Sequence, residues 1–198
     1  PGQGLPLPDG QFIQDLFKQK LANLDTLNMQ KGTAVSDTGE ISIDRLRNLF
    51  KISSPLTEAM IIAPKLPIQN SGAMSVVNEG ATTALFCLSS LDGKQIKDSQ
   101  KMILFHITDA QNSKLKFSGK NMTILEKGGT LPVLARKGNA TVTISGLNMD
   151  KIFKVWATDM TGKRLFEMKS EVFEGGVLNF YPAVIKDKNI IMTYEIIA

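Results

Sequence analysis

Residue types that catalytic and metal sites need are scarce in this chain of 198 residues, which has one cysteine, one histidine and one tryptophan. The single cysteine, Cys87, cannot form a disulfide within the chain, and its apolar neighbours predict a small buried side chain. The single histidine, His106, has no second histidine or nearby cysteine to complete a zinc ligand set. We therefore predict that the chain holds no metal and no cofactor.

Long apolar runs and basic clusters with interleaved aromatic rings are also missing. No apolar run reaches the ~18 residues of a membrane span. Lysine and arginine number 23 against 19 aspartate and glutamate, which gives a net charge of +4. We interpret these cations as scattered over solvated faces and loops. Neither a membrane nor a nucleic acid is therefore predicted as a partner.

The first 32 residues differ in pattern from the rest. Residues 1–8 are rich in proline and glycine and read as an extended lead-in. Asp9 can cap a helix, and an apolar stripe at helical spacing follows to about Leu27. Because the chain begins with Pro1 rather than methionine, we expect residues 1–32 to connect an upstream domain to the remainder. The stripe consists of Phe12, Ile13, Leu16, Phe17, Leu21 and Leu24.

From residue 33 onward, short apolar segments alternate with turn residues. This spacing, without a second long helix, disfavours βαβ folds and favours antiparallel strands. The predicted fold class is all-β: an antiparallel β-sandwich over residues 33–198, Ig-like or jelly-roll-like, with one short N-terminal helix. The prolines at 64–67 leave open a split into two β-subdomains near 64–72. Predicted strands are 41–43, 49–53, 59–63, 73–77, 83–89, 102–108, 122–125, 131–136, 140–145, 152–158, 164–169, 177–180 and 190–196.

The alternation of side chains along a strand assigns faces to His106 and Trp156. In 102–108, Ile103 and Phe105 mark one face, and His106 points to the other, where we predict a hydrogen-bonded structural role. In 153–158, Val155 marks one face and Trp156 points to the opposite, more polar one. The Trp156 ring could stack on a sugar, pack against the N-terminal helix or a neighbouring domain, or lie in the core.

Four polar or aromatic residues join Trp156 as candidate carbohydrate contacts. Asp109, Gln111 and Asn112 form a predicted polar loop after the strand 102–108, where they could bind sugar hydroxyls or calcium, or cap their own backbone. Tyr181 is a second aromatic candidate. Paired carboxylates, a nucleophile with its base and a phosphate-binding glycine loop are not recognisable, so no catalytic residue is predicted.

Short motifs occur in a set order along the chain, at 36–41 (SDTGEI), 91–94 (LDGK), 101–113 (KMILFHITDAQNS), 154–159 (KVWATD) and 162–164 (GKR). Together they resemble the C-terminal β-sandwich region of glycoside hydrolases from gut and marine bacteria. The resemblance covers roughly residues 33–198. In those proteins a (β/α)8 catalytic barrel precedes the sandwich, and residues 9–27 would correspond to its last helix or to a connector.

The resemblance implies a non-catalytic accessory module of a secreted or periplasmic enzyme that degrades polysaccharides. Its partner would be the upstream catalytic domain, which the module braces, and its targeting signal would also lie upstream. The catalytic carboxylates would sit on the barrel strands, so none is carried over to this chain. Two alternatives remain: an independent carbohydrate-binding module that exposes Trp156 or Tyr181, and a structural or adhesion domain of Ig-like type.

Overall fold

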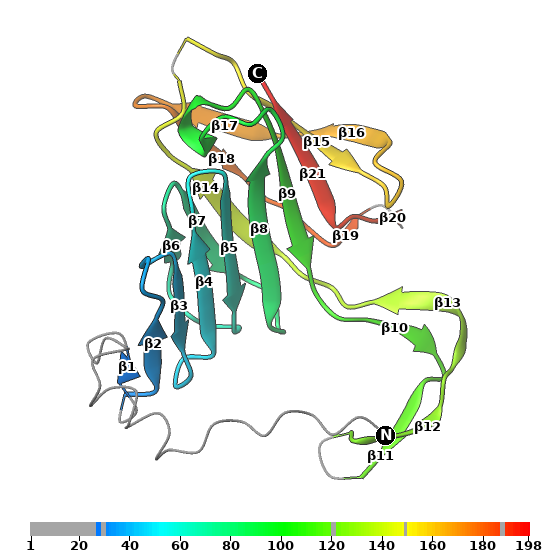
Figure 1. Ribbon diagram of the computed structural model, residues 1–198. Helices are drawn as coiled ribbons and strands as arrows, with labels where there is room; N and C mark the ends of the chain where they lie inside the picture. Colours follow the sequence, from blue (N-terminus) through cyan, green and yellow to red (C-terminus); the bar gives the residue numbers. More distant parts are fainter. Residues whose placement is uncertain (1–26, 29–30, 120–121, 149, 187–188) are drawn as a thin grey trace.

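The computed structural model describes residues 27–28, 31–119, 122–148, 150–186 and 189–198 (Figure 1). These residues form β-strands, all paired antiparallel, and one short 3-10 helix at Ile96–Asp98. The predicted all-β antiparallel class is confirmed. The described residues contain no α-helix, and Leu27, the last residue of the predicted N-terminal helix, belongs to a strand instead. Residues 9–26 of that prediction lie outside the described residues.

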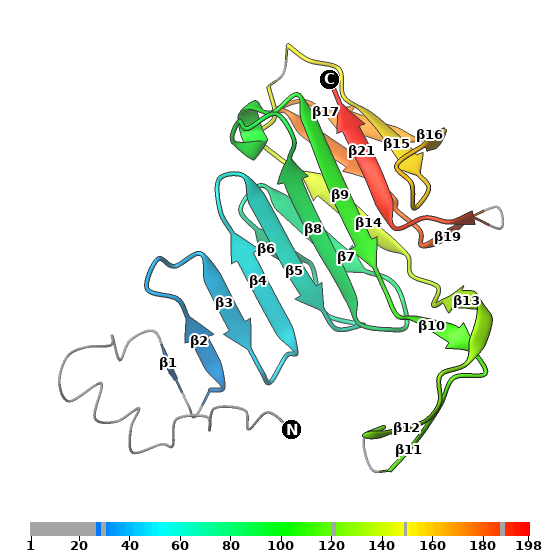
Figure 2. The ribbon, with the colours of Figure 1, turned by 45° about the vertical axis from the view of Figure 1, so that its right-hand side comes forward.

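Ten strands form the large sheet, which runs across the whole molecule (Figure 2). Its first five strands follow each other as hairpins, and its last five bring together distant parts of the sequence. In spatial order the strands are β1 (Leu27–Asn28), β2 (Thr33–Val35), β3 (Ile41–Asp44), β4 (Leu49–Ser53), β5 (Thr57–Ile62), β8 (Ala84–Ser90), β9 (Lys101–Ile107), β21 (Thr193–Ile197), β15 (Lys154–Thr158) and β16 (Arg164–Met168).

Five strands form a second sheet that lies behind the large one in Figure 1. Residues 63–68, where the sequence left a domain split open, carry the chain from β5 in one sheet to β6 in the other. The order is β17 (Ser170–Phe173), β18 (Val177–Phe180), β14 (Ala140–Ile144), β7 (Met74–Asn78) and β6 (Gln69–Ser71), and a small hairpin pairs β19 (Ile185–Lys186) with β20 (Asn189–Ile190).

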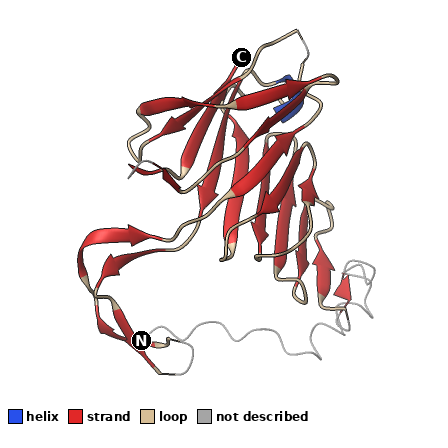
Figure 3. Cartoon of the chain, turned by 180° about the vertical axis from the view of Figure 1, so that it is seen from behind, coloured by secondary structure: helices blue, strands red, loops and turns tan. Residues whose placement is uncertain are grey.

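Residues 109–119 and 122–137 project from this two-layer body as an arm, seen clearly from behind in Figure 3. The arm consists of two ribbons of two strands each. At its base β10 (Ala110–Ser113) pairs with β13 (Thr130–Ala135), and toward its tip β11 (Lys116–Ser118) pairs with β12 (Ile124–Lys127). Gln111 and Asn112 therefore lie in a strand, whereas the sequence predicted a loop for them.

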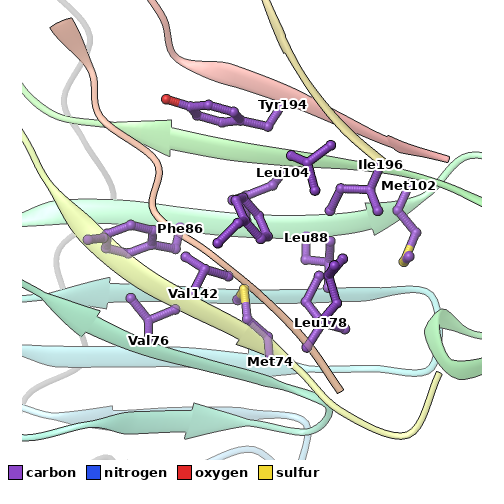
Figure 4. Packing of buried hydrophobic residues seen from close by; sticks show 14 of the residues in the cluster. Met74, Val76, Phe86, Leu88, Met102, Leu104, Val142, Leu178, Tyr194 and Ile196 are labelled. Atoms are coloured by element: carbon purple, nitrogen blue, oxygen red, sulfur yellow. The ribbon is translucent and has the colours of Figure 1, made fainter. Parts of the chain in front are cut away.

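The core lies between the two sheets and follows from strand alternation. Every second side chain of the central strands points inward, and these side chains pack into one cluster (Figure 4). Phe86, Leu88 and Leu104 come from the large sheet, while Val76 and Val142 come from the second sheet. Residues on both sides of the 64–72 stretch thus share one hydrophobic core.

Glu58 provides a polar link between the layers. Its carboxylate points inward from β5 and accepts backbone N–H groups of Ala73 and Met74, both at 2.7 Å. Gly72 precedes them with a φ of +58°, and a Cβ there would collide with the Glu58 carboxylate. Burial raises the pKa of Glu58, while the two backbone hydrogen bonds oppose that shift. The link therefore depends on a glycine at position 72.

His106 is buried between the layers at the base of the arm. Its ring stacks on Phe86 with centroids 4.5 Å apart, and among the described residues neither ring nitrogen has a hydrogen-bond partner. The predicted face is confirmed, but the predicted hydrogen-bonded role is wrong. Gly138 lies so close that a Cβ there would come within 3.0 Å of Nε2. Burial lowers the pKa of His106 to about 4.

Replacing His106 with leucine should remove part of the acid sensitivity of folding. The lowered pKa keeps the folded state unprotonated while the unfolded chain binds a proton at its ordinary value of about 6.5. Stability is therefore lost as the pH falls from about 6.5 to about 4. Urea titrations across this range should show that His106→Leu loses less free energy of unfolding than wild type, by up to about 3 kcal/mol. Equal losses would contradict the buried neutral state.

Candidate functional site

The five candidate carbohydrate contacts do not form one site. Trp156 lies on β15 of the large sheet, with its side chain on the face away from the core. Asp109, Gln111 and Asn112 lie in the arm. Tyr181 follows β18, exposed on the outward side of the second sheet, where its hydroxyl accepts the Asn179 amide at 3.1 Å. The two aromatic candidates thus occupy opposite faces of the molecule.

The polar candidates of the arm have local partners. The Asp109 carboxylate lies 3.3 Å from the Arg136 guanidinium, and its backbone carbonyl accepts the Arg136 N–H at 2.8 Å. Asn112 donates its side-chain amide to the carbonyl of Gly128 at 2.9 Å. Gln111 is exposed. Both side-chain contacts reach across the arm to Gly128 and Arg136, so they hold the ribbon together and are not caps on the segment's own backbone.

Trp156 lies in a charged cluster on the outer face of the large sheet. The Arg164 guanidinium carbon is 5.2 Å from the ring centroid, and Arg164 Nε donates to the Glu195 carboxylate at 2.6 Å. Lys101 Nζ lies 3.6 Å from the same carboxylate. The pKa of Glu195 is lowered by the Arg164 hydrogen bond, so this carboxylate is an ionised acceptor rather than a general acid. The buried indole N–H of Trp156 has no partner among the described residues.

A hollow of about 350 Å³ lies beside this cluster. Strands β9, β21 and β15 form its floor through Ile103, Thr193 and Thr158, and the turn at 159–162 borders it. Glu195 and Lys101 also line it, so hydroxyl, carboxylate and ammonium groups face the same space. Trp156 is not among the residues that line the hollow; its ring lies beside Glu195 under the Arg164 guanidinium. The hollow itself offers polar groups that can hydrogen-bond a polyhydroxylated ligand.

Elsewhere on the outer face, strand register arranges apolar residues in two rows, beside the polar pair of Thr57 and Ser89. Directly paired residues across β2, β3, β4, β5, β8 and β9 make the first row: Ala34, Ile43, Phe50, Ile61, Leu85 and Ile107. The second row crosses β3, β4, β5, β8 and β9: Ile41, Ile52, Ala59, Cys87 and Phe105. Most of these side chains are half-buried or exposed. We call them the apolar rows.

The outward side of the second sheet is mixed, with Val77, Phe173 and Val177 beside a polar row. The polar row has five residues, one from each strand: Asn70, Ser75, Thr143, Asn179 and Glu171. Antiparallel sheets that face water on one side carry polar residues there. The apolar rows depart from this rule, which marks the outer face of the large sheet as a surface suited to contact rather than to water.

Cys87 belongs to the apolar rows and corrects a prediction. The sequence predicted a buried cysteine, but the inward residues of β8 are Phe86 and Leu88, and Cys87 is half-buried on the outer face. Its sulfur lies 3.9 Å from the Ser89 hydroxyl. The apolar run 84–88 misled the prediction because both faces of this strand are apolar, and only the three-dimensional structure shows which one is covered.

Sequence reasoning missed Glu195 and Arg164, which complete the Trp156 cluster. Alternation in the predicted strand 190–196 puts Glu195 on the same side as Thr193, and this was the available signal. The decisive fact is register: Glu195 pairs with Trp156 on one side and with Ile103 on the other. Arg164 comes from the next strand, β16. Such cross-strand neighbours cannot be read from spacing within one segment.

Neither a metal site in the described residues, nor a membrane-spanning helix there, nor a similar known protein assigns a further role to the chain. Among the described residues, no group of three or more histidine, cysteine, aspartate or glutamate side chains could hold a metal ion. No helix in the described part of the chain is long and apolar enough to cross a membrane. No family model, no curated protein and no solved structure matches this chain.

Removing the Arg164 side chain should uncover the Trp156 ring. As Trp156 is the only tryptophan, its fluorescence reports this site alone. We expect Arg164→Ala to shift the emission to longer wavelength and to increase acrylamide quenching, because the guanidinium stacks over the ring. The matched control is Arg136→Ala, which removes an arginine paired with Asp109 in the arm. Identical spectra for wild type and Arg164→Ala would show that the contact does not persist in solution.

Proposed function

We propose that this chain is a non-catalytic accessory module of a secreted or periplasmic glycoside hydrolase. Its two sheets would form an Ig-like or jelly-roll-like β-sandwich that braces the upstream catalytic domain. The observation that carries the bracing role is the pair of apolar rows on the outer face of the large sheet. The assignment to glycoside hydrolases rests on the motif resemblance of residues 33–198.

The physical argument for a covered face is the contrast between the two sheets. The second sheet exposes a polar row, whereas the large sheet exposes isoleucine, leucine and phenylalanine in register. Removing apolar surface from water contributes about 25 cal/mol per Å², so a neighbouring domain seated on these rows would be held by the hydrophobic effect. Interfaces between domains of one chain typically bury about 600–1,500 Å².

The test uses the native polypeptide that contains this chain together with any preceding domain. Ile61→Asn places a polar group in the centre of the first apolar row, where Ile61 is exposed in the described structure. We expect little change in the free energy of unfolding of the 198-residue chain. The equilibrium constant for docking of the module on its neighbouring domain should fall at least tenfold, which corresponds to about 1.4 kcal/mol. Differential scanning calorimetry should show separate unfolding of the two domains in the variant.

Val77→Asn is the matched control, because Val77 is a half-buried β-branched residue on the outward side of the second sheet. It should leave domain coupling unchanged. Hydrolysis of a panel of polysaccharides by the native polypeptide tests the enzymatic part. A polypeptide without hydrolase activity, or equal effects of the two substitutions, would overturn the proposed function.

The second candidate function is carbohydrate binding by the module itself, favoured by the Trp156 cluster and its hollow. The hollow offers a carboxylate, an ammonium and hydroxyl groups, and the Trp156 ring lies beside its Glu195. Trp156→Ala should then abolish retention of the chain in affinity electrophoresis with a polysaccharide, while Tyr181→Ala on the opposite face should not. An absence of binding across a broad panel of neutral and acidic polysaccharides would exclude this role.

A further inference from the structure

The sequence segment that includes the arm accounts for the whole net charge of the protein. Residues 109–137 contain six of the 23 cations and two of the 19 anions, so this segment has a net charge of +4 and the remainder has seventeen of each sign. The cations, which looked scattered in the sequence, are Lys114, Lys116, Lys120, Lys127, Arg136 and Lys137. Lys116 and Arg136 pair with the arm's own Glu126 and Asp109. Within the described residues, Lys114 and Lys127 have no ion pair.

The arm also exposes large apolar side chains on both of its sides. On β13 the neighbours Val133 and Leu134 point in opposite directions, and both are exposed. Leu131 is 81% exposed. The apolar set also includes Phe117, Ile124 and Leu125 from the outer ribbon. Such a density of exposed apolar groups on one projection marks an interaction surface.

The arm has a defined shape although each ribbon has only two strands. Ser113 donates its hydroxyl to the Pro132 carbonyl at 2.7 Å, and Asn112 donates to Gly128 at 2.9 Å. Gly129 has a φ of +75°, and a Cβ there would come within 2.6 Å of the Ser113 carbonyl oxygen, so the ribbons meet at a glycine. Two-stranded ribbons are only marginally stable in water, and a partner that covers them would stabilise them.

We propose that the arm docks on an acidic, apolar-lined surface of a folded domain in the same polypeptide. This inference rests on the part of the proposed function that gives the module a neighbouring domain, but it does not require that domain to be a glycosidase. Charge complementarity selects an acidic partner surface, and the exposed leucine, valine and phenylalanine side chains require apolar contact beside it. The arm would then be a second attachment, separate from the apolar rows.

The same observations disfavour two other occupants. The rest of a second copy has no net negative charge to attract the arm, because the residues outside the segment 109–137 are neutral overall. A lipid bilayer would require the polar backbone groups of the ribbons to be satisfied, yet each ribbon has two open edges in the described structure. A protein surface can hydrogen-bond such edges while burying the apolar side chains.

Hydrogen exchange followed by mass spectrometry tests the proposal on the native polypeptide and on the 198-residue chain. We expect the amides of residues 110–135 to exchange at least tenfold more slowly in the native polypeptide. Leu131→Ser, and separately Lys114→Glu with Lys127→Glu, should return these rates toward those of the 198-residue chain. Equal rates in the two wild-type proteins would overturn the proposal.

Two matched control variants make the same kinds of change outside the arm. Ile152→Ser removes a side chain that is 80% exposed outside the arm, and Lys94→Glu with Lys97→Glu reverses two exposed lysines of the β8–β9 connection. Both should leave the arm rates unchanged. Protection of the 198-residue chain that rises with its own concentration, or that appears on vesicles with anionic phospholipid, would overturn the proposal in favour of self-association or lipid.

The hydrolase assay on the same polypeptide separates this inference from the proposed function. If the native polypeptide has hydrolase activity but the amides of its arm are not protected from exchange, only the docking of the arm is overturned. A protected arm without hydrolase activity would support the docking and overturn the glycoside hydrolase assignment.

Discussion

The constraint on which the structure depends is that the central strands of the large sheet are apolar on both faces. Alternation sends Phe86 and Leu88 of β8 into the core, and leaves Leu85 and Cys87 on the other side. One face is covered by the second sheet. The other face keeps its apolar rows. The outer face of the large sheet is therefore the side on which we expect a partner to bind.

Strand register aligns the outward apolar side chains of neighbouring strands into one surface. A strand with two apolar faces would expose only isolated side chains if its neighbours were out of phase. Here antiparallel pairing aligns Phe50, Ile61 and Leu85 across β4, β5 and β8, and the second sheet aligns Ser75, Thr143 and Asn179 in the same way. The large sheet has two aligned apolar rows on its outer face, whereas the outward side of the second sheet has a complete polar row that crosses all five strands.

The sequence predicted what depends on local periodicity. The all-β class, most strand positions and the opposite faces of His106 and Phe105 follow from alternation within one segment. Contacts between distant parts of the chain could not be predicted in this way: Glu195 pairs with Trp156, and the His106 ring stacks on Phe86, with no hydrogen-bond partner for its nitrogens among the described residues. The arm was missed because its ribbons carry apolar residues without covering anything, so its strands 122–125 and 131–136 resembled core strands.

The two surfaces of the large sheet meet at β9, which bears on the two candidate functions. Phe105 and Ile107 of β9 end the apolar rows, while Ile103 on the same face pairs with Glu195 and lines the hollow near Trp156. A domain seated on the apolar rows would therefore have its edge beside the Trp156 cluster. Bracing and sugar contact would then use neighbouring parts of one face, with the boundary at β9 and the half-buried Trp156 ring two strands beyond it, on β15.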